Sequence, residues 1–175
     1  HDNMEIISIP LSGELKHGDS MGNTTVIKEG EVQVMSAGTG IIHSEMNNRT
    51  DMAVQFLQIW IFPDKKNVMP RYDQKLIDKE SVTNRLGEIV SPNEGEEWVW
   101  INQQAWFYLG EFSDNQTIEY LTKNRENGIY IFLLEGEATI DAHKLNRRDA
   151  IAVTEAEVLS IDISKDSKIL VMEVP

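Results

Sequence analysis

Residues 38–47, GTGIIHSEMN, carry the residue types best suited to chemistry in this chain. His43 and Glu45 are separated by one residue and follow two glycines, in a chain with only 4 histidines. Side chains two positions apart on a strand point to the same face, so an imidazole and a carboxylate would be presented together. Both groups bind divalent metals. The pattern predicts a metal site or, as the simpler alternative, a turn with a hydrogen-bonded His–Glu pair.

A second pair with the same character stands at the beginning of the sequence. His1 and Glu5 are four residues apart, which also places both on one face of an extended strand. A barrel could bring this strand and the strand with His43 and Glu45 together over its interior. Imidazole and carboxylate ligands with open positions are the set that a redox-active divalent iron prefers.

The other two histidines are assigned to turns. His17 lies in KHGDSMGN, where the favoured interpretation is a loop residue bonded to Asp19 or to the backbone. His143 lies in the hairpin-like DAHKLN and is interpreted as a solvated loop residue.

Alternating apolar and polar residues predict an all-β fold around these candidates. Strand patterns occur at 4–15, 31–35 and 52–62, and they return from residue 98 to the end. The polar stretch 63–97 holds three of the 5 prolines and alternates little, apart from a short strand pattern at GEIV. We therefore predict a domain at 1–62, a connecting segment at 63–97 and a second domain at 98–175.

The two predicted domains echo each other. LSGELKHGDS…KEGEVQVM in the first resembles LEGEATIDAH…NRRDAIAV in the second, which suggests a duplicated antiparallel β-barrel. Aligning Gly13 with Gly136 sets Asn124 opposite His1 and Gly128 opposite Glu5. Because the second copy lacks both ligand types, we predict that it binds no metal.

Composition limits the class of protein. The chain has no cysteine, which excludes disulfides and thiol nucleophiles, and this is compatible with a cytoplasmic location. Its formal net charge of −13 would repel phosphate backbones, so direct nucleic-acid binding is not expected. The longest apolar run, at 129–134, is far shorter than the ~20 residues of a membrane helix, so no membrane association is expected either.

Taken together, these motifs resemble the bacterial branch of the pirin family, within the cupin superfamily. The resemblance rests on HDNMEIISIPLSGEL, HGDSMGN, GEVQVMSAGTGIIHSEMN, PRYDQK, AWFYLGEF, FLLEGEATI and ILVMEVP, and it covers nearly the whole chain. It implies a bicupin, two stacked antiparallel barrels of the double-stranded β-helix or jelly-roll type, with one divalent metal in the N-terminal barrel only. Because the sequence starts inside the first metal motif, we expect a first barrel that is incomplete at its N-terminus.

The resemblance also implies a set of ligands. The family binds its metal through two histidines of an H-P-H motif and through the histidine and glutamate of H-S-E. Carried over, these are His1, His43 and Glu45, and the remaining histidine would stand two residues before His1. Glu5 is a rival ligand or an orienting partner of a ligand. Fe(II) is the preferred metal, with Zn, Mn, Ni, Co or Cu as alternatives.

The activity implied is that of a quercetin 2,3-dioxygenase, which cleaves a flavonol with O₂. Glu45 would accept the proton of the flavonol hydroxyl, whose pKa the metal lowers. The alternative is a metal-binding regulator whose partner is a transcription factor or a metabolic enzyme, and the acidic surface favours a protein partner. A metal-free structural remnant is the third reading.

Overall fold

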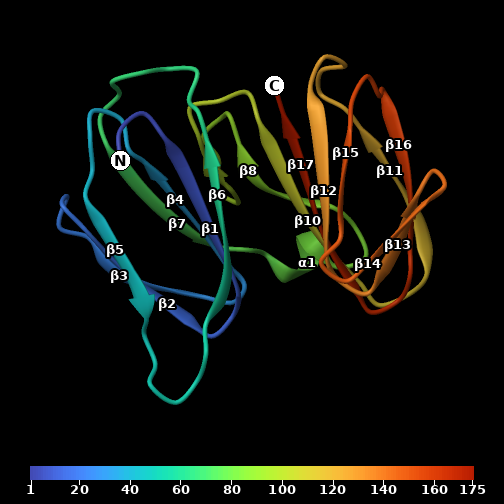
Figure 1. Cartoon of the computed structure of the whole chain (residues 1–175), viewed down its shortest axis with the longest axis horizontal. Helices are drawn as coiled ribbons and strands as arrows, with labels where there is room; N and C mark the ends of the chain where they lie inside the picture. The colour runs from blue at the N-terminus through green and yellow to red at the C-terminus, as the bar shows by residue number, and fades with distance from the viewer. The chain divides into compact units, whose positions relative to one another are not determined.

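The computed structural model describes all residues 1–175 and is built almost entirely of antiparallel strands (Figure 1). The predicted all-β class is confirmed. Two compact units are present, one of residues His1–Ile77 with Ser91–Gln103 and one of Asp78–Val90 with Gln104–Pro175. The predicted connecting segment 63–97 is thus divided between the two units: residues 63–77 and 91–97 belong to the first and residues 78–90 to the second. No helix is long and apolar enough to cross a membrane.

The first unit contains two sheets, which Figure 1 shows in blue to green. The larger has the order β6-β1-β4-β7, with strands at Gln55–Ile61, Glu5–Ser12, Glu31–Ser36 and Arg71–Leu76. The smaller has the order β3-β2-β5, with strands at Thr24–Lys28, Glu14–Asp19 and His43–Asn47. A short strand, β9 (Val99–Trp100), completes this unit.

Gly13 divides what the alternation alone presents as one long strand. Its φ of 76° lies in the left-handed region, and a Cβ there would lie 2.5 Å from the carbonyl oxygen of Ala53. Only glycine meets both conditions without strain. The chain therefore leaves the larger sheet at Ser12 and enters the smaller one at Glu14.

The register of the paired strands shows which side chains of the larger sheet face the smaller one. Ser8 pairs with Gln33 on β4 and with Gln58 on β6, and Gln33 pairs with Gln74 on β7. Residues paired across antiparallel strands point to the same face. Because Ser8 reaches Glu45 of the smaller sheet, this polar row faces the interior of the first unit.

The second unit is packed differently. One sheet has the order β15-β12-β17-β10-β8, with strands at Ala150–Val153, Gly128–Glu135, Ser167–Val174, Trp106–Phe112 and Gly87–Ser91. The other has the order β11-β16-β13-β14, with strands at Gln116–Leu121, Val158–Ile163, Glu137–Ile140 and His143–Asn146. Leu133, Ile140, Ile161 and Val171 belong to the single apolar cluster between them, and each is at most 1% exposed.

The segment between the two long strand regions is more regular than its composition suggests. The strand expected at GEIV is confirmed as β8, but β7 and the one-turn helix α1 (Lys79–Val82) have no clear pattern in the sequence. Asp78 caps α1 by accepting hydrogen bonds from the backbone of Glu80 and Ser81. In β7, RYDQKL, polar residues occupy positions on both faces, which conceals the strand period.

Candidate metal centre

The pairing of β2 with β5 brings four ligand-type side chains onto one face. His17 lies directly opposite Glu45, and Asp19 lies opposite His43. Residues 17 and 19 share a face because a strand has a period of two, and so do residues 43 and 45. The outward residues of β5 confirm this orientation, since Ile42 just before the strand is 80% exposed and Met46 is 55% exposed.

Three of these side chains form a compact donor group. One nitrogen of His17, one nitrogen of His43 and one carboxylate oxygen of Glu45 all lie within 4.8 Å of one another. The Nδ1 atoms of His17 and His43 are buried and have no hydrogen-bond partner. Two unpaired imidazole nitrogens beside a carboxylate are a donor set that fits a divalent cation of intermediate softness.

The ring of His1 also lies beside that of His43. The centroids of these two rings are 5.1 Å apart, and the His1 ring makes an edge contact with Trp60 at 4.8 Å. The backbone of His1 is fixed by a reciprocal pair of hydrogen bonds with Ile41, of 2.8 and 2.9 Å. The structure therefore places the predicted ligand His1 beside His43, but the compact donor group consists of His17, His43 and Glu45 and does not include His1.

Glu45 is held by the larger sheet. Its Oε2 accepts a hydrogen bond of 2.5 Å from Gln58 Nε2, whose Oε1 accepts one of 3.1 Å from Trp60. Its Oε1 has only a long contact of 3.5 Å with Ser8 Oγ and lies 3.9 Å from His43 Nδ1. Oε2 is thus engaged, whereas Oε1 retains free acceptor capacity toward the histidines.

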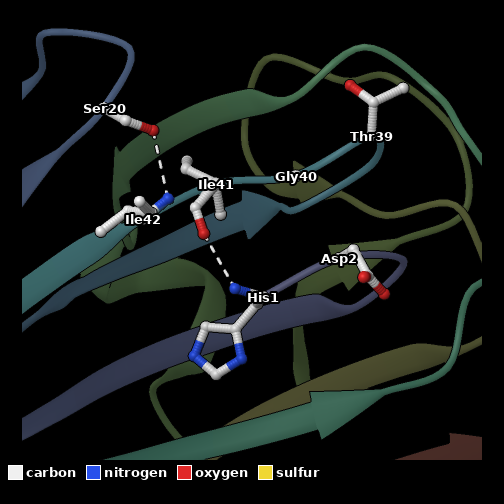
Figure 2. A pocket seen from close by; sticks show the side chains of 7 residues that line it. All are labelled: His1, Asp2, Ser20, Thr39, Gly40, Ile41 and Ile42. Atoms are coloured by element: carbon white, nitrogen blue, oxygen red, sulfur yellow. Dashed lines mark hydrogen bonds between the residues drawn. The ribbon is translucent and has the colours of Figure 1, made fainter.

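The two glycines before His43 form the turn that leads into β5. Gly38 and Gly40 have φ values of 50° and 139°, and a Cβ on Gly38 would collide with the backbone of Val68. This turn forms part of a cavity of about 680 Å³ lined by His1, Asp2, Ser20 and residues 39–42 (Figure 2). Figure 2 shows Ser20 Oγ accepting a hydrogen bond from the backbone nitrogen of Ile42, which ties the turn before β3 to the start of β5.

Glu5 is not brought to this cluster. Its carboxylate is fully buried and accepts hydrogen bonds from Ser36 Oγ at 2.7 Å and from Asn102 Nδ2 at 3.1 Å. Two features explain this. Glu5 lies on the face of β1 opposite to that of Ser8, and Asn3, with φ of 42°, breaks the extended chain that would have aligned His1 with Glu5.

His17 makes the expected hydrogen bond to Asp19, at 3.0 Å. It is not a loop residue, however, because it lies within β2 and is fully buried against His43 and Tyr72. One signal for its burial was available in the sequence, since His17 shares a strand face with Leu15. The position of His17 opposite Glu45 depends on the pairing of β2 with β5, and the sequence alone does not predict that pairing. His143 is exposed as expected, although it begins strand β14.

Electrostatics favour the metal-binding form of His43. Burial lowers the pKa of this imidazole, and the nearby His17 acts in the same direction, whereas Glu45 opposes the shift. A metal binds the neutral imidazole, so a lowered pKa reduces competition from protons. The site can therefore hold a cation through neutral nitrogens and one carboxylate.

The corresponding region of the second unit is occupied by protein groups. The backbone nitrogen of Asn124, which the internal echo sets opposite His1, donates to the buried carboxylate of Glu173. The same carboxylate accepts from Tyr120 at 2.6 Å and from Asn127 at 2.7 Å. This network fixes the turn before β12, and the interior behind it is filled by apolar side chains.

Comparison with known proteins identifies both halves. The pirin family model matches residues 1–61, and a model described as a quercetinase C-terminal cupin domain matches residues 88–174. A quercetin 2,3-dioxygenase of Escherichia coli K12 is 32% identical over 176 residues, which cover 100% of this chain and 74% of that protein.

Solved structures agree. The bacterial pirin YhhW of E. coli in complex with nickel(II) superposes with a TM-score of 0.92 at 30% identity, over 100% of this chain and 74% of that one. A quercetin 2,3-dioxygenase of Acinetobacter baumannii, at 22% identity, gives a TM-score of 0.80 over 99% of this chain and 60% of that one. This last similarity concerns the fold alone.

Proposed function

Because the chain belongs to the pirin family of cupin proteins, we propose that it is a metal-dependent dioxygenase of the quercetinase type, acting on flavonols with O₂. The observation that carries the proposal is the pair of buried, unpartnered imidazole nitrogens beside Glu45. The related quercetin 2,3-dioxygenase and the nickel(II) complex of a related pirin support it.

The proposed ligands are His1, His43 and Glu45, with Fe(II) as the preferred metal. A divalent ion held by these side chains can keep coordination positions open for a substrate, as catalytic metal sites do. His43 and Glu45 are fixed by alternate positions on one face of β5, and His1 is fixed by its backbone pairing with Ile41. The donor set fits a divalent cation, and Ni, Co, Mn, Zn or Cu would be accepted by the same atoms.

When bound, the metal would supply Lewis acidity toward a flavonol hydroxyl and the redox chemistry toward O₂. The protein groups have three tasks beside it. Glu45 Oε1 can accept the hydroxyl proton, because Gln58 holds only the other oxygen. The cavity of about 680 Å³ beside His1 is of the size that a three-ring aromatic ligand requires. Trp60 is 52% exposed and makes an edge contact with the ring of His1, so it offers a flat apolar surface beside that ligand.

The experiment that tests the proposal is oxygen uptake with quercetin by iron-loaded protein, compared between wild type and His43→Ala. We expect the variant to lose both bound metal and oxygen uptake while its circular dichroism spectrum is unchanged. His143→Ala is the matched control and should behave as wild type, because His143 is exposed on β14. An active His43→Ala variant, or a metal-loaded wild type without flavonol-dependent oxygen uptake, would contradict the proposal.

A further inference from the structure

We propose that His17 is an additional metal ligand of the first unit, through its Nδ1 atom, and that Asp19 is the residue that positions it. The inference rests on the proposed metal centre but extends it to a side chain outside the motif from which the ligands were assigned. It concerns binding of the ion alone and does not depend on the flavonol reaction.

The hydrogen bond to Asp19 determines which nitrogen of His17 is free. The Oδ1 atom of Asp19 accepts hydrogen bonds from the backbone nitrogens of Met21 and Asn23, and its Oδ2 atom accepts one from Asn23 Nδ2. Both oxygens of this carboxylate therefore act as acceptors, so the Nε2 atom of His17 carries the hydrogen in its contact with Oδ2. In the neutral ring the lone pair is then on Nδ1.

That lone pair has no partner in the protein. His17 is fully buried, and its Nδ1 makes no hydrogen bond. A buried acceptor without a partner is costly, and histidines that serve only to fill a core have both nitrogens satisfied. The β2–β5 register places Glu45 directly opposite His17, and the ring centroid of His43 lies 5.6 Å from that of His17, so the nitrogen of His17 that is not bonded to Asp19 is the one available to these two side chains.

The spacing permits one ion to be shared. Two atoms that each lie about 2.1 Å from a common ion are at most about 4.2 Å apart. The donor atoms of His17, His43 and Glu45 all lie within 4.8 Å of one another, so a separation at that limit has to shorten by about 0.6 Å or more for the atoms to share an ion. A histidine whose other nitrogen donates to a carboxylate is the usual arrangement of a metal-bound imidazole.

Asp19 is itself rigidly held, which makes it suited to positioning. Its Oδ1 accepts from the backbone nitrogens of Met21 and Asn23 at 2.9 and 3.0 Å, and its Oδ2 accepts from Asn23 Nδ2 at 2.8 Å. Asp19→Asn would keep the shape of this turn while turning the atom that faces Nε2 into a donor. His17 would then place its hydrogen on Nδ1, and the lone pair that faces the centre would be lost.

The test is titration of the full chain with Co(II) alone and with Ni(II) alone, following affinity and the visible absorption spectrum. We compare wild type with His17→Gln, Asp19→Asn and the control His143→Gln. We expect affinity to fall at least 10-fold in His17→Gln and about 10- to 100-fold in Asp19→Asn, with a changed Co(II) spectrum in both. The control should match wild type in both readouts.

Three outcomes would overturn the inference. They are a Co(II) spectrum and affinity of His17→Gln equal to those of wild type, an unchanged affinity of Asp19→Asn, and a wild type that binds neither ion. Asp19→Asn keeps His17 in place, so it remains informative if His17→Gln fails to fold. Metal binding that depends on His17 without any oxygen uptake would refute the proposed dioxygenase and leave this inference intact.

Discussion

The hydrogen bond from Gln58 to Glu45 offers the sharpest test of how the first unit prepares its centre. Gln58 Nε2 lies 2.5 Å from Glu45 Oε2, and the side chain of Glu45 is only 14% exposed. Gln58→Leu keeps the approximate volume of residue 58 and removes the donor. The carboxylate then loses its single short hydrogen bond and becomes free to rotate about its last side-chain bond.

Two magnitudes follow. A hydrogen bond to a charged group contributes about 1.5–3 kcal/mol, and because Glu45 is partly solvated we expect a loss of about 1.5 kcal/mol in the free energy of unfolding. Loss of a partner that orients a metal ligand weakens metal binding by about 10- to 100-fold. The affinity loss should therefore appear in addition to the loss of stability.

The assay is urea unfolding followed by circular dichroism on the metal-free protein, together with Ni(II) titration calorimetry of folded samples. Gln55→Leu is the control, since Gln55 is exposed on the same strand. If Gln58→Leu loses stability but binds Ni(II) as tightly as wild type, then the hydrogen bond supports the fold without orienting the ligand, and the reasoning is refuted.

Two further predictions concern the turn before β5 and the second unit. Gly38→Ala should destabilise the protein by about 1–3 kcal/mol and reduce Ni(II) binding, because residue 38 has a φ of 50° and its Cβ would meet Val68. Gly30→Ala is the control for the collision, because Gly30 also has a positive φ, of 84°, but open space at its Cβ; equal effects of the two substitutions in thermal melts would contradict this prediction. Burial and the neighbouring Glu173 raise the pKa of Tyr120 above its unfolded value of about 10, so its stabilising contribution is complete below pH 10 and declines as the pH rises further. Tyr120→Phe should therefore be less stable than wild type at pH 8, and urea unfolding curves should show the difference narrowing above pH 10; a constant difference would exclude the linkage.

Much of the architecture was predictable from the sequence, because strands with one buried face alternate. The shared face of His43 and Glu45 follows from their spacing. The glycines at 38 and 40 predict the turn that orients the strand on which both residues lie. The position of His1 depends on a long-range contact with Ile41, yet its assignment could be reached from the resemblance. These features are local or belong to a motif, which is why a single sequence reveals them.

The features that the sequence did not reveal depend on which strands pair. His17 faces Glu45 only because β2 pairs with β5, and nothing in KHGDSMGN fixes that register. Glu5 is directed to Asn102, which is 97 residues away, so its spacing from His1 was misleading. A positive φ at Asn3 is enough to cancel the rule that residues four apart on a strand share a face.

The interiors of the two units differ in polarity, which explains why a metal centre is proposed for the first unit only. The interior of the first unit presents His17, Gln33, Glu45, Gln58 and Gln74, of which His17 and Gln33 have a buried atom without a hydrogen-bond partner. One apolar cluster of this unit comprises Ile6, Met35, Ala37 and Ile41. Such an interior gives up hydrophobic stabilisation, since each buried apolar side chain contributes about 1.5–3 kcal/mol. In the second unit, strands of the same pattern enclose a continuous apolar core. Its one buried carboxylate, Glu173, accepts hydrogen bonds at both oxygens. Unsatisfied buried polar atoms occur in the first unit and not in the second, which supports the metal centre proposed for the first unit, and the binding experiments on His17, Asp19 and Gln58 test which of these side chains contribute to it.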